Sequence, residues 1–294
     1  MMDEPFSVRR EYGIFIRLYH SIFGEVSVMK RWIVLIGVMV CLSPAAMGQK
    51  VLIVTEQPKL EVEGAGNLGD YLRGKGYTVT VDPTQTPGTS EFQGQLTADD
   101  IALLESFDVV IVHRAISSGN YNGSGIDDQW CELKVPVLLG SAYLARNTRW
   151  FWVDSAQMRT VDLEYEILVP DHPIVKGLTG EVFDTPLGID HVGAGDVGGG
   201  TIVAQLPGSE NPAIIAWGPN DALAAGGGRV HTYPRVFIPI YRYHETTENE
   251  GGSYATDPAD GDFINYTANG LSMYHQAIQW LLSFSTGVED WSCY

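Results

Sequence analysis

The chain has few cysteines, and it lacks the short motifs of common hydrolases and zinc proteases. Three cysteines among 294 residues are too few for a disulfide scaffold. An oxidising compartment would permit one bridge between Cys131 and Cys293, but we expect one buried thiol and one tail thiol. No Gly-x-Ser-x-Gly elbow, His-Glu-x-x-His helix or Cys-x-x-Cys pair occurs in the sequence. This argues against standard serine hydrolases and zinc proteases.

Positive charge is also scarce. The chain has 18 Lys and Arg residues against 36 Asp and Glu residues, which gives a formal net charge of -18. A surface of this charge repels the phosphate groups of nucleic acids and of anionic membranes. We therefore expect no nucleic acid partner.

No apolar run has the length of an ordinary membrane span. Residues 33–42 are apolar, but a span needs roughly 20 such residues. Lys30 and Arg31 precede this run, and Ala46 and Gly48 follow it at the two positions that a signal peptidase reads. We expect an exported protein, periplasmic or extracellular, after cleavage near Gly48. If the segment is not cleaved, it serves as a membrane anchor instead.

The sequence does contain a repeated alternation of strand and helix patterns. Short apolar, β-branched runs, typical of strands buried on both faces, occupy residues 51–54, 77–81, 109–112 and 135–139. Helical patterns fall between them, at residues 68–73, 97–104 and 127–133. Later strands are predicted at residues 202–206, 213–217 and 236–241, and a last helix at 270–284. This order predicts an α/β fold, with a doubly wound, mostly parallel sheet and helices on both faces.

The length suits one large domain better than two small ones. We expect an N-terminal extension with the signal peptide at residues 1–48, an α/β domain at 49–286 and a C-terminal tail at 287–294. No internal repeat or low-complexity linker divides the domain.

Two glycine-rich segments, residues 64–69 and 193–198, match the dinucleotide fingerprint Gly-x-Gly-x-x-Gly. Asp82 closes the second strand, where a ribose-binding acid would lie. However, residues 56–63 separate the first segment from its strand, so a pyrophosphate would not meet the helix terminus. The second match indicates that 33 glycines produce the pattern by chance. We predict no cofactor.

Polar side chains follow three of the predicted parallel strands. Ligands of open α/β sheets bind outside the carboxyl ends of the strands. Glu56 follows the first strand, His113 and Arg114 follow the third, and Ser141 and Tyr143 follow the fourth. A carboxylate, an imidazole, a guanidinium and a hydroxyl converging there would support acid–base or nucleophilic chemistry. The alternative is that these loops are polar only because they lie at the surface.

Two acidic segments raise the question of a metal site. One is Asp190 with His191, and the other is residues 257–262, which miss the ligand register and closing glutamate of an EF-hand. A solvated turn is the favoured interpretation, so no metal is predicted. We keep Asp190 and His191 as ligand-binding candidates.

Residues 171–178, Asp-His-Pro-Ile-Val-Lys-Gly-Leu, lie between the fourth strand and the later strands. They resemble the His-Pro-Ile-x-x-Gly-Leu segment of trehalose-utilisation (ThuA-like) proteins, which belong to the class I glutamine amidotransferase-like group. Residues 51–54, 228–230 and 277–281 resemble the first strand, a late strand and the last helix of that group. The resemblance implies a flavodoxin-like three-layer sandwich and a role with carbohydrate.

Classical amidotransferases of this group carry a nucleophilic cysteine after a central strand, with a histidine and a glutamate arriving from a later strand. The comparable turn of this chain has Ser141 and no cysteine, so glutamine hydrolysis through a cysteine is not expected. The resemblance leaves His244 as the later histidine.

We therefore predict a domain that acts on or binds a carbohydrate or another small polar ligand at the carboxyl edge of the sheet. The catalytic candidates are His113, Ser141 and His244, and the ligand-binding candidates are Glu56, Arg114, Tyr143, Asp190 and His191. The alternative is a non-catalytic binding or interaction module on the same fold. In that case aromatic residues such as Trp150 and Trp152 stack on sugar rings, unless they fill the core.

Overall fold

The computed structural model describes residues 48–56, 68–84, 88–114, 116–156, 158–161, 165–178, 189–224, 228–239 and 267–286. These residues belong to the compact unit that runs from Ala46 to Tyr294. The predicted export segment ahead of Gly48, the tail after residue 286, and His244 lie outside the described ranges. Within those ranges, no helix combines the length and the apolar character needed to cross a membrane.

The core of the unit is an eight-stranded sheet. Its order is β2 (Thr78–Val81), β1 (Lys50–Val54), β3 (Val109–Val112), β4 (Val137–Leu139), β10 (Arg235–Phe237), β9 (Pro212–Trp217), β8 (Thr201–Gln205) and β6 (Glu166–Ile167). The first five strands run parallel, whereas β9, β8 and β6 each pair antiparallel with their neighbours. The predicted α/β fold with a mostly parallel sheet is confirmed. A second sheet pairs β5 (Met158–Val161) with β7 (Ile189–Val192).

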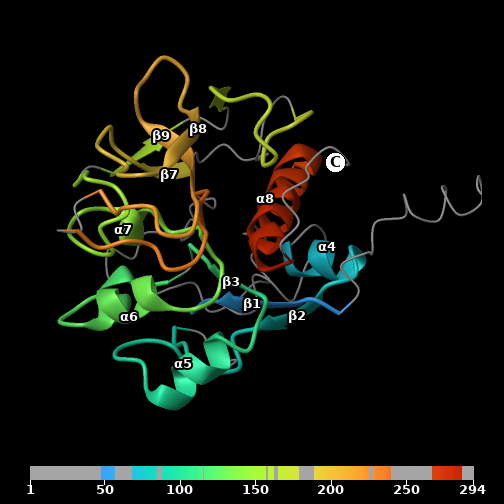
Figure 1. The fold of residues 1–294 in the computed structure, drawn as a ribbon, viewed down its shortest axis with the longest axis vertical. Helices are drawn as coiled ribbons and strands as arrows, with labels where there is room; N and C mark the ends of the chain where they lie inside the picture. The colour runs from blue at the N-terminus through green and yellow to red at the C-terminus, as the bar shows by residue number, and fades with distance from the viewer. Residues whose placement is uncertain are drawn as a thin grey trace, which may run out of the picture. The chain divides into compact units, whose positions relative to one another are not determined.

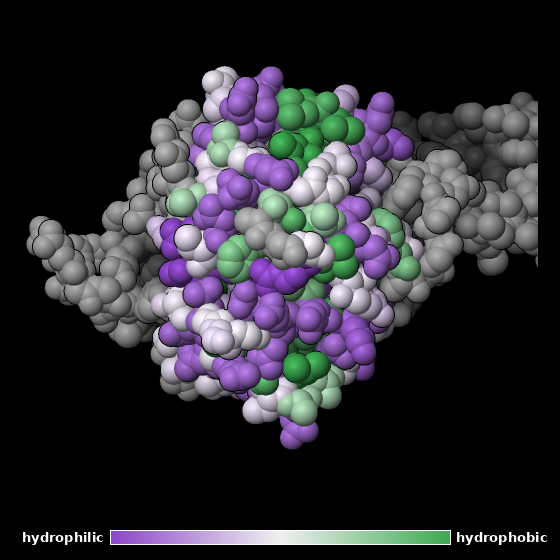
Figure 2. Space-filling model, turned by 60° about the vertical axis from the view of Figure 1, so that its left-hand side comes forward, coloured by the Kyte–Doolittle hydropathy of each residue, from purple (hydrophilic) through white to green (hydrophobic). Residues whose placement is uncertain are grey.

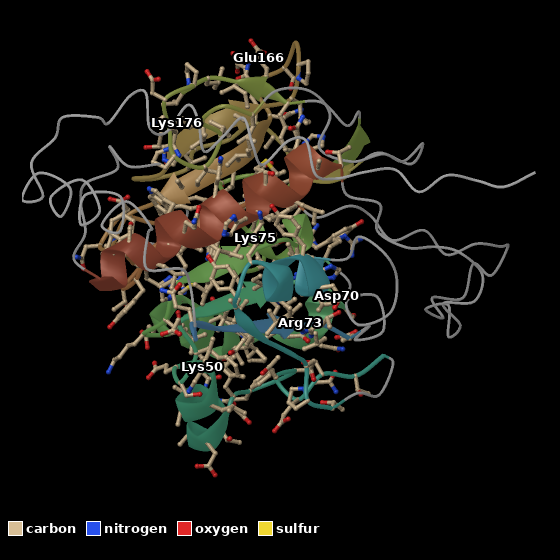
Figure 3. The ribbon with its side chains drawn as sticks, turned by 90° about the vertical axis from the view of Figure 1, so that its right-hand side faces the viewer. Lys50, Asp70, Arg73, Lys75, Glu166 and Lys176 are labelled. Carbon is tan, nitrogen blue, oxygen red and sulfur yellow. The ribbon has the colours of Figure 1, made fainter. Side chains whose placement is uncertain are left out.

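Helices cover both faces of the parallel strands (Figure 1). On β1, Val51 and Ile53 pack with α4 (Leu68–Gly74) and α8 (Ala268–Thr286), and Figure 3 shows these two helices on the same side of the sheet. Leu52 and Val54 point to the opposite face, which packs with α5 (Ala98–Leu104), α6 (Ile126–Glu132) and α7 (Ala142–Ala145). A short 3-10 helix, η2 (Ser118–Tyr121), precedes α6. This alternation explains why the central strands β3 and β4 are apolar at every position.

The start of α5 follows the sequence pattern. The Thr97 side chain accepts a hydrogen bond from the Asp100 backbone N–H (3.2 Å), and the Asp100 carboxylate accepts one from the Thr97 N–H (2.7 Å). This reciprocal capping satisfies two donors that the helix leaves unpaired. The helix predicted over residues 97–104 is confirmed, with Thr97 as its N-cap.

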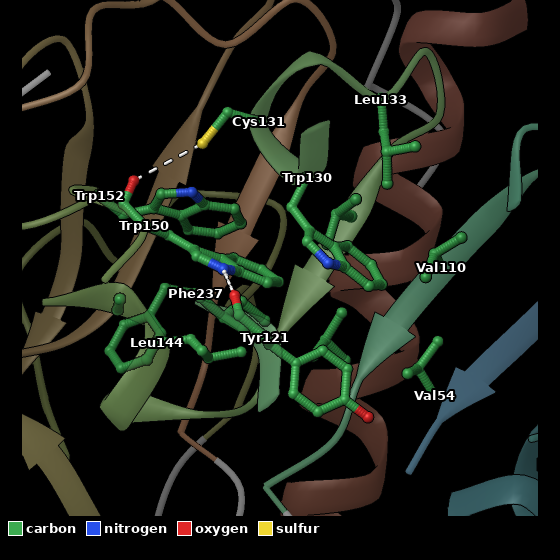
Figure 4. Close-up of a cluster of buried hydrophobic side chains, with 14 of the residues drawn as sticks. Val54, Val110, Tyr121, Trp130, Cys131, Leu133, Leu144, Trp150, Trp152 and Phe237 are labelled. Carbon is green, nitrogen blue, oxygen red and sulfur yellow. Dashed lines mark hydrogen bonds between the residues drawn. The ribbon is translucent and has the colours of Figure 1, made fainter. Parts of the chain in front are cut away.

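The buried cluster in Figure 4 contains Trp150 and Trp152, the two tryptophans considered above for stacking on sugar rings. Trp150 and Trp152 are fully buried, and Trp150 stacks on Trp130 with ring centres 5.1 Å apart. The Trp150 indole N–H donates to the Tyr121 carbonyl (2.8 Å). Both tryptophans therefore fill the core and are not available to stack on a ligand.

Cys131 belongs to the same cluster and is a free, buried thiol, as expected. Its Sγ lies 3.6 Å from the Trp150 carbonyl oxygen, and burial raises the pKa of this thiol to about 11. It is therefore a packing residue and not a nucleophile.

The second glycine-rich segment is explained by close packing. A side chain at Gly195 would collide with the Asp154 backbone, and one at Gly198 would collide with the Ala222 carbonyl. Gly198 also has a positive φ of 61°. The close approach of these backbone segments requires glycine at both positions. The glycine pattern is therefore explained without a bound nucleotide.

Residues 171–178 dock on the last helix. Ile174 and Val175 are buried against α8, and the His172 ring lies 5.6 Å from the Trp280 ring. The Gln276 side chain donates to the Lys176 carbonyl (3.3 Å). The segment therefore packs the helix against the sheet.

The face of the molecule in Figure 2 is mostly hydrophilic, and its apolar side chains form separate patches. The large exposed apolar residues of the described ranges come from different elements: Leu103, Leu168, Val230, Tyr233 and Phe284. These residues therefore form no single large apolar patch on the face shown.

Candidate functional site

The parallel strands bring the predicted site residues to one edge of the sheet. Pairing continues one residue past the strand ends, since the His113 N–H donates to the Val54 carbonyl (3.0 Å) and the Gly140 N–H to the Val112 carbonyl (2.8 Å). β1 lies between β2 and β3, so the order in which successive strands join the sheet reverses beside β1, although all three strands run parallel. This is the place where open α/β sheets bind ligands.

The carboxylate of Glu56 is buried and holds the loop after β3. Its two oxygens accept hydrogen bonds from the Ser117 backbone N–H and the Asn120 side-chain amide, both at 3.0 Å. Burial raises the pKa of Glu56, although these two hydrogen bonds oppose the shift and the charge of Asp82 adds to it. Glu56 thus holds the segment after β3 in place through buried hydrogen bonds.

Asp82 lies at the end of β2 and is also buried. Its carboxylate accepts hydrogen bonds from the Ser90 hydroxyl and from the backbone N–H groups of Thr84 (3.1 Å) and Glu91 (3.3 Å). These contacts give Asp82 a turn-forming role, in place of the ribose contact that the fingerprint suggested.

Strand alternation separates His113 from the other candidates. His113 is buried and follows Ile111 by two residues, which places it on the α8 side of the sheet. Arg114 follows Val112, and Ser141 follows Leu139, so both continue the opposite face. The edge therefore brings Arg114 and Ser141 together on one face and directs His113 to the other.

Ser141 occupies the turn between β4 and α7, where the resemblance places a nucleophile. The residue is fully buried, and its hydroxyl has no hydrogen-bond partner among the described residues. It precedes α7 without capping it. A buried hydroxyl without a partner costs about 1–3 kcal/mol, so this position is energetically unsatisfied.

Tyr143 lies two residues further along, in α7, and is flanked by two guanidinium groups. The guanidinium carbon of Arg114 is 4.6 Å from the ring centre, and that of Arg146 is 5.7 Å away. Burial, and next the charge of Arg149, lower the pKa of Arg146. The sequence prediction missed Arg146 and Arg149, although two arginines three residues apart are conspicuous in so acidic a chain.

Asp190 and His191 lie in strand β7, and the prediction of a solvated turn was wrong for this pair. β7 packs against α7 (Figure 1), which brings it near the Tyr143 region. His191 is buried, and its Nδ1–H donates to the Val192 carbonyl (2.6 Å). Strand pairing with β5 explains this burial, which turn composition could not reveal.

The described ranges contain no group of three or more acidic, His or Cys side chains arranged to hold a metal ion. His244, the third catalytic candidate, lies outside those ranges. Comparison of the chain with protein-family models gives no match, and neither does comparison with curated proteins.

Proposed function

We propose that this chain is an exported ThuA-like domain that binds a carbohydrate or another small polar ligand at the carboxyl edge of β1, β3 and β4. The observation that carries the proposal is the buried, unpartnered hydroxyl of Ser141. A ligand hydroxyl would satisfy it, and Arg114 and Tyr143 border the same turn. The location agrees with the general binding position of open α/β sheets.

Binding without turnover is the form of the proposal that the described contacts favour. A serine nucleophile needs a base within hydrogen-bond reach. None of the described residues hydrogen bonds to the Ser141 hydroxyl, and strand alternation directs His113 to the opposite face. His244 is the remaining base candidate, and its contribution is an outcome of the test.

The test is calorimetric titration of the chain with trehalose, glucose and sugar acids, comparing wild type with Ser141→Ala. The variant loses a hydrogen bond to the ligand, which should weaken binding about tenfold. Its unfolding midpoint should stay level or rise, because no described hydrogen bond is lost. Ser106→Ala is the matched control: that exposed serine donates to the Leu103 carbonyl ahead of β3, at the opposite edge of the sheet.

Two results would overturn the proposal. One is the absence of saturable binding by any sugar of the panel. The other is equal weakening of binding in Ser141→Ala and Ser106→Ala. Turnover of a bound sugar that is lost in His244→Ala would replace the binding module with an enzyme.

A further inference from the structure

Two arginines flank Tyr143, and a third lies near one of them, in a chain that carries a net charge of -18. Arg114 and Arg146 both contact the Tyr143 ring, and Arg149 is near enough to Arg146 to depress its pKa. All four side chains are half-buried. Positive charge is thus gathered at the very edge where the ligand is proposed to bind.

Arg146 and Arg149 form no ion pair within the described parts of the chain. The Nε atoms of both are buried without a hydrogen-bond partner. The nearest acid in sequence, Asp154, accepts a hydrogen bond from the Asn147 side chain instead (2.8 Å). Burying part of a guanidinium beside another one is unfavourable unless an anion compensates.

Other arginines of the protein show the contrast. Arg73 pairs with Asp70 at 2.7 Å on α4 (Figure 3), and Arg229 pairs with Asp127 and Asp128. Both of these arginines therefore pair with carboxylates, whereas no carboxylate pairs with Arg146 or Arg149 within the described residues.

We propose that Arg146 and Arg149, with Tyr143 and Arg114 beside them, form a subsite for an oxyanion of the ligand. A guanidinium donates in a planar fork, which suits carboxylate, phosphate and sulfate oxygens alike. The Tyr143 ring holds two of the guanidinium groups through cation–π contacts, so little ordering remains when the anion binds. This inference rests on the proposed function and narrows its ligand class to an acidic sugar, a sugar phosphate or a similar anion.

The primary test uses sulfate and inorganic phosphate, so it does not depend on identifying the sugar. Thermal unfolding is followed with each anion against chloride at matched ionic strength. We expect sulfate to raise the midpoint of the wild type in a saturable way, and Arg146→Gln to weaken that binding at least about tenfold. Arg73→Gln removes the same charge from α4 and should leave the effect intact.

A second readout separates a binding role from a structural one. Without anion and at low salt, Arg146→Gln should unfold at the same temperature as wild type or higher, since like-charge repulsion from Arg149 disappears. A lower midpoint together with an unchanged sulfate effect would overturn the subsite, as would equal sulfate effects in wild type, Arg146→Gln and Arg73→Gln.

Titration with glucose, glucuronate and glucose 6-phosphate identifies the source of the oxyanion. Tighter binding of either charged sugar than of glucose, with the difference lost in Arg146→Gln, supports the subsite and names its ligand. Sulfate binding that depends on Arg146, with no sugar bound, would support the subsite while overturning the carbohydrate proposal. Equal binding of all three sugars would overturn the subsite and leave the carbohydrate proposal intact.

Discussion

The buried imidazole of His231 should make the folded protein lose stability as the pH falls. The ring packs edge-on against both Trp152 and Trp217, whose ring centres are 4.9 Å and 5.4 Å away. Both ring nitrogens are buried without hydrogen-bond partners among the described residues. Burial, and next the positive charge of Arg235, lower the pKa of His231 well below its ordinary value. As the pH falls, His231 is therefore protonated in the unfolded chain at a pH where it is still neutral in the folded chain.

The size of the effect follows from this difference in proton binding. A histidine whose pKa is depressed by folding contributes stability that is present above its unfolded pKa and is lost as the pH falls. Between about pH 7 and pH 5, one such group removes up to about 2 kcal/mol from the free energy of unfolding. His275, whose pKa is lowered to about 4 by burial and by Lys75, should contribute a similar loss.

The assay is urea unfolding of wild type and His231→Phe across that pH range. The phenylalanine keeps the aromatic contacts and cannot be protonated, so the variant should be close to wild type at neutral pH and should lose up to about 2 kcal/mol less on acidification. His275→Phe is the comparison variant and should show a reduction of the same order. If His231→Phe and wild type have parallel pH curves, the reasoning about the buried imidazole fails.

Two further predictions concern packing. Arg235 is buried and donates hydrogen bonds to the carbonyls of Cys131, Leu133, Val135 and Pro234; Arg235→Met should lower the free energy of unfolding in urea by about 2 kcal/mol or more, because these acceptors lose their donor. Wild-type stability would contradict this. Gly198→Ala should lower the free energy of unfolding by about 2 kcal/mol or more, since the φ of Gly198 is 61° and a Cβ would lie 2.8 Å from the Leu223 carbonyl carbon. Gly76 also has a positive φ, but a Cβ there would meet no neighbouring atom, so Gly76→Ala should lower the free energy of unfolding by only about 1 kcal/mol. Equal losses of stability in Gly198→Ala and Gly76→Ala would refute the packing explanation.

The parallel half of the sheet could be predicted because its strands are buried on both faces. Runs such as residues 109–112 are apolar at every position, and the helices between them have clear boundaries, as at Thr97. The direction of β9 and β8 could not be predicted in this way. Apolar periodicity locates a strand without giving its orientation, and β6, with only Glu166 and Ile167, is too short to leave a pattern.

The sequence predicted where Ser141 and Arg114 lie in the fold, but not which other side chains the fold brings near them. The rule for strand ends found Ser141 and Arg114. It could not tell that strand alternation turns His113 to the other face, since all three residues follow strands. Arg146 and Arg149 escaped because they lie beyond α7, a helix of four residues that no periodicity reveals.

The central claim is that ligand binds at the carboxyl edge beside Ser141. Hydrogen–deuterium exchange with and without saturating sulfate or glucuronate tests it most directly, because protection reports location whatever the affinity. We predict slower exchange in peptides covering residues 113–121 and 140–150, and unchanged exchange in β8 and α8. Protection confined to β8 or α8, with residues 140–150 unaffected by a bound ligand, would contradict it.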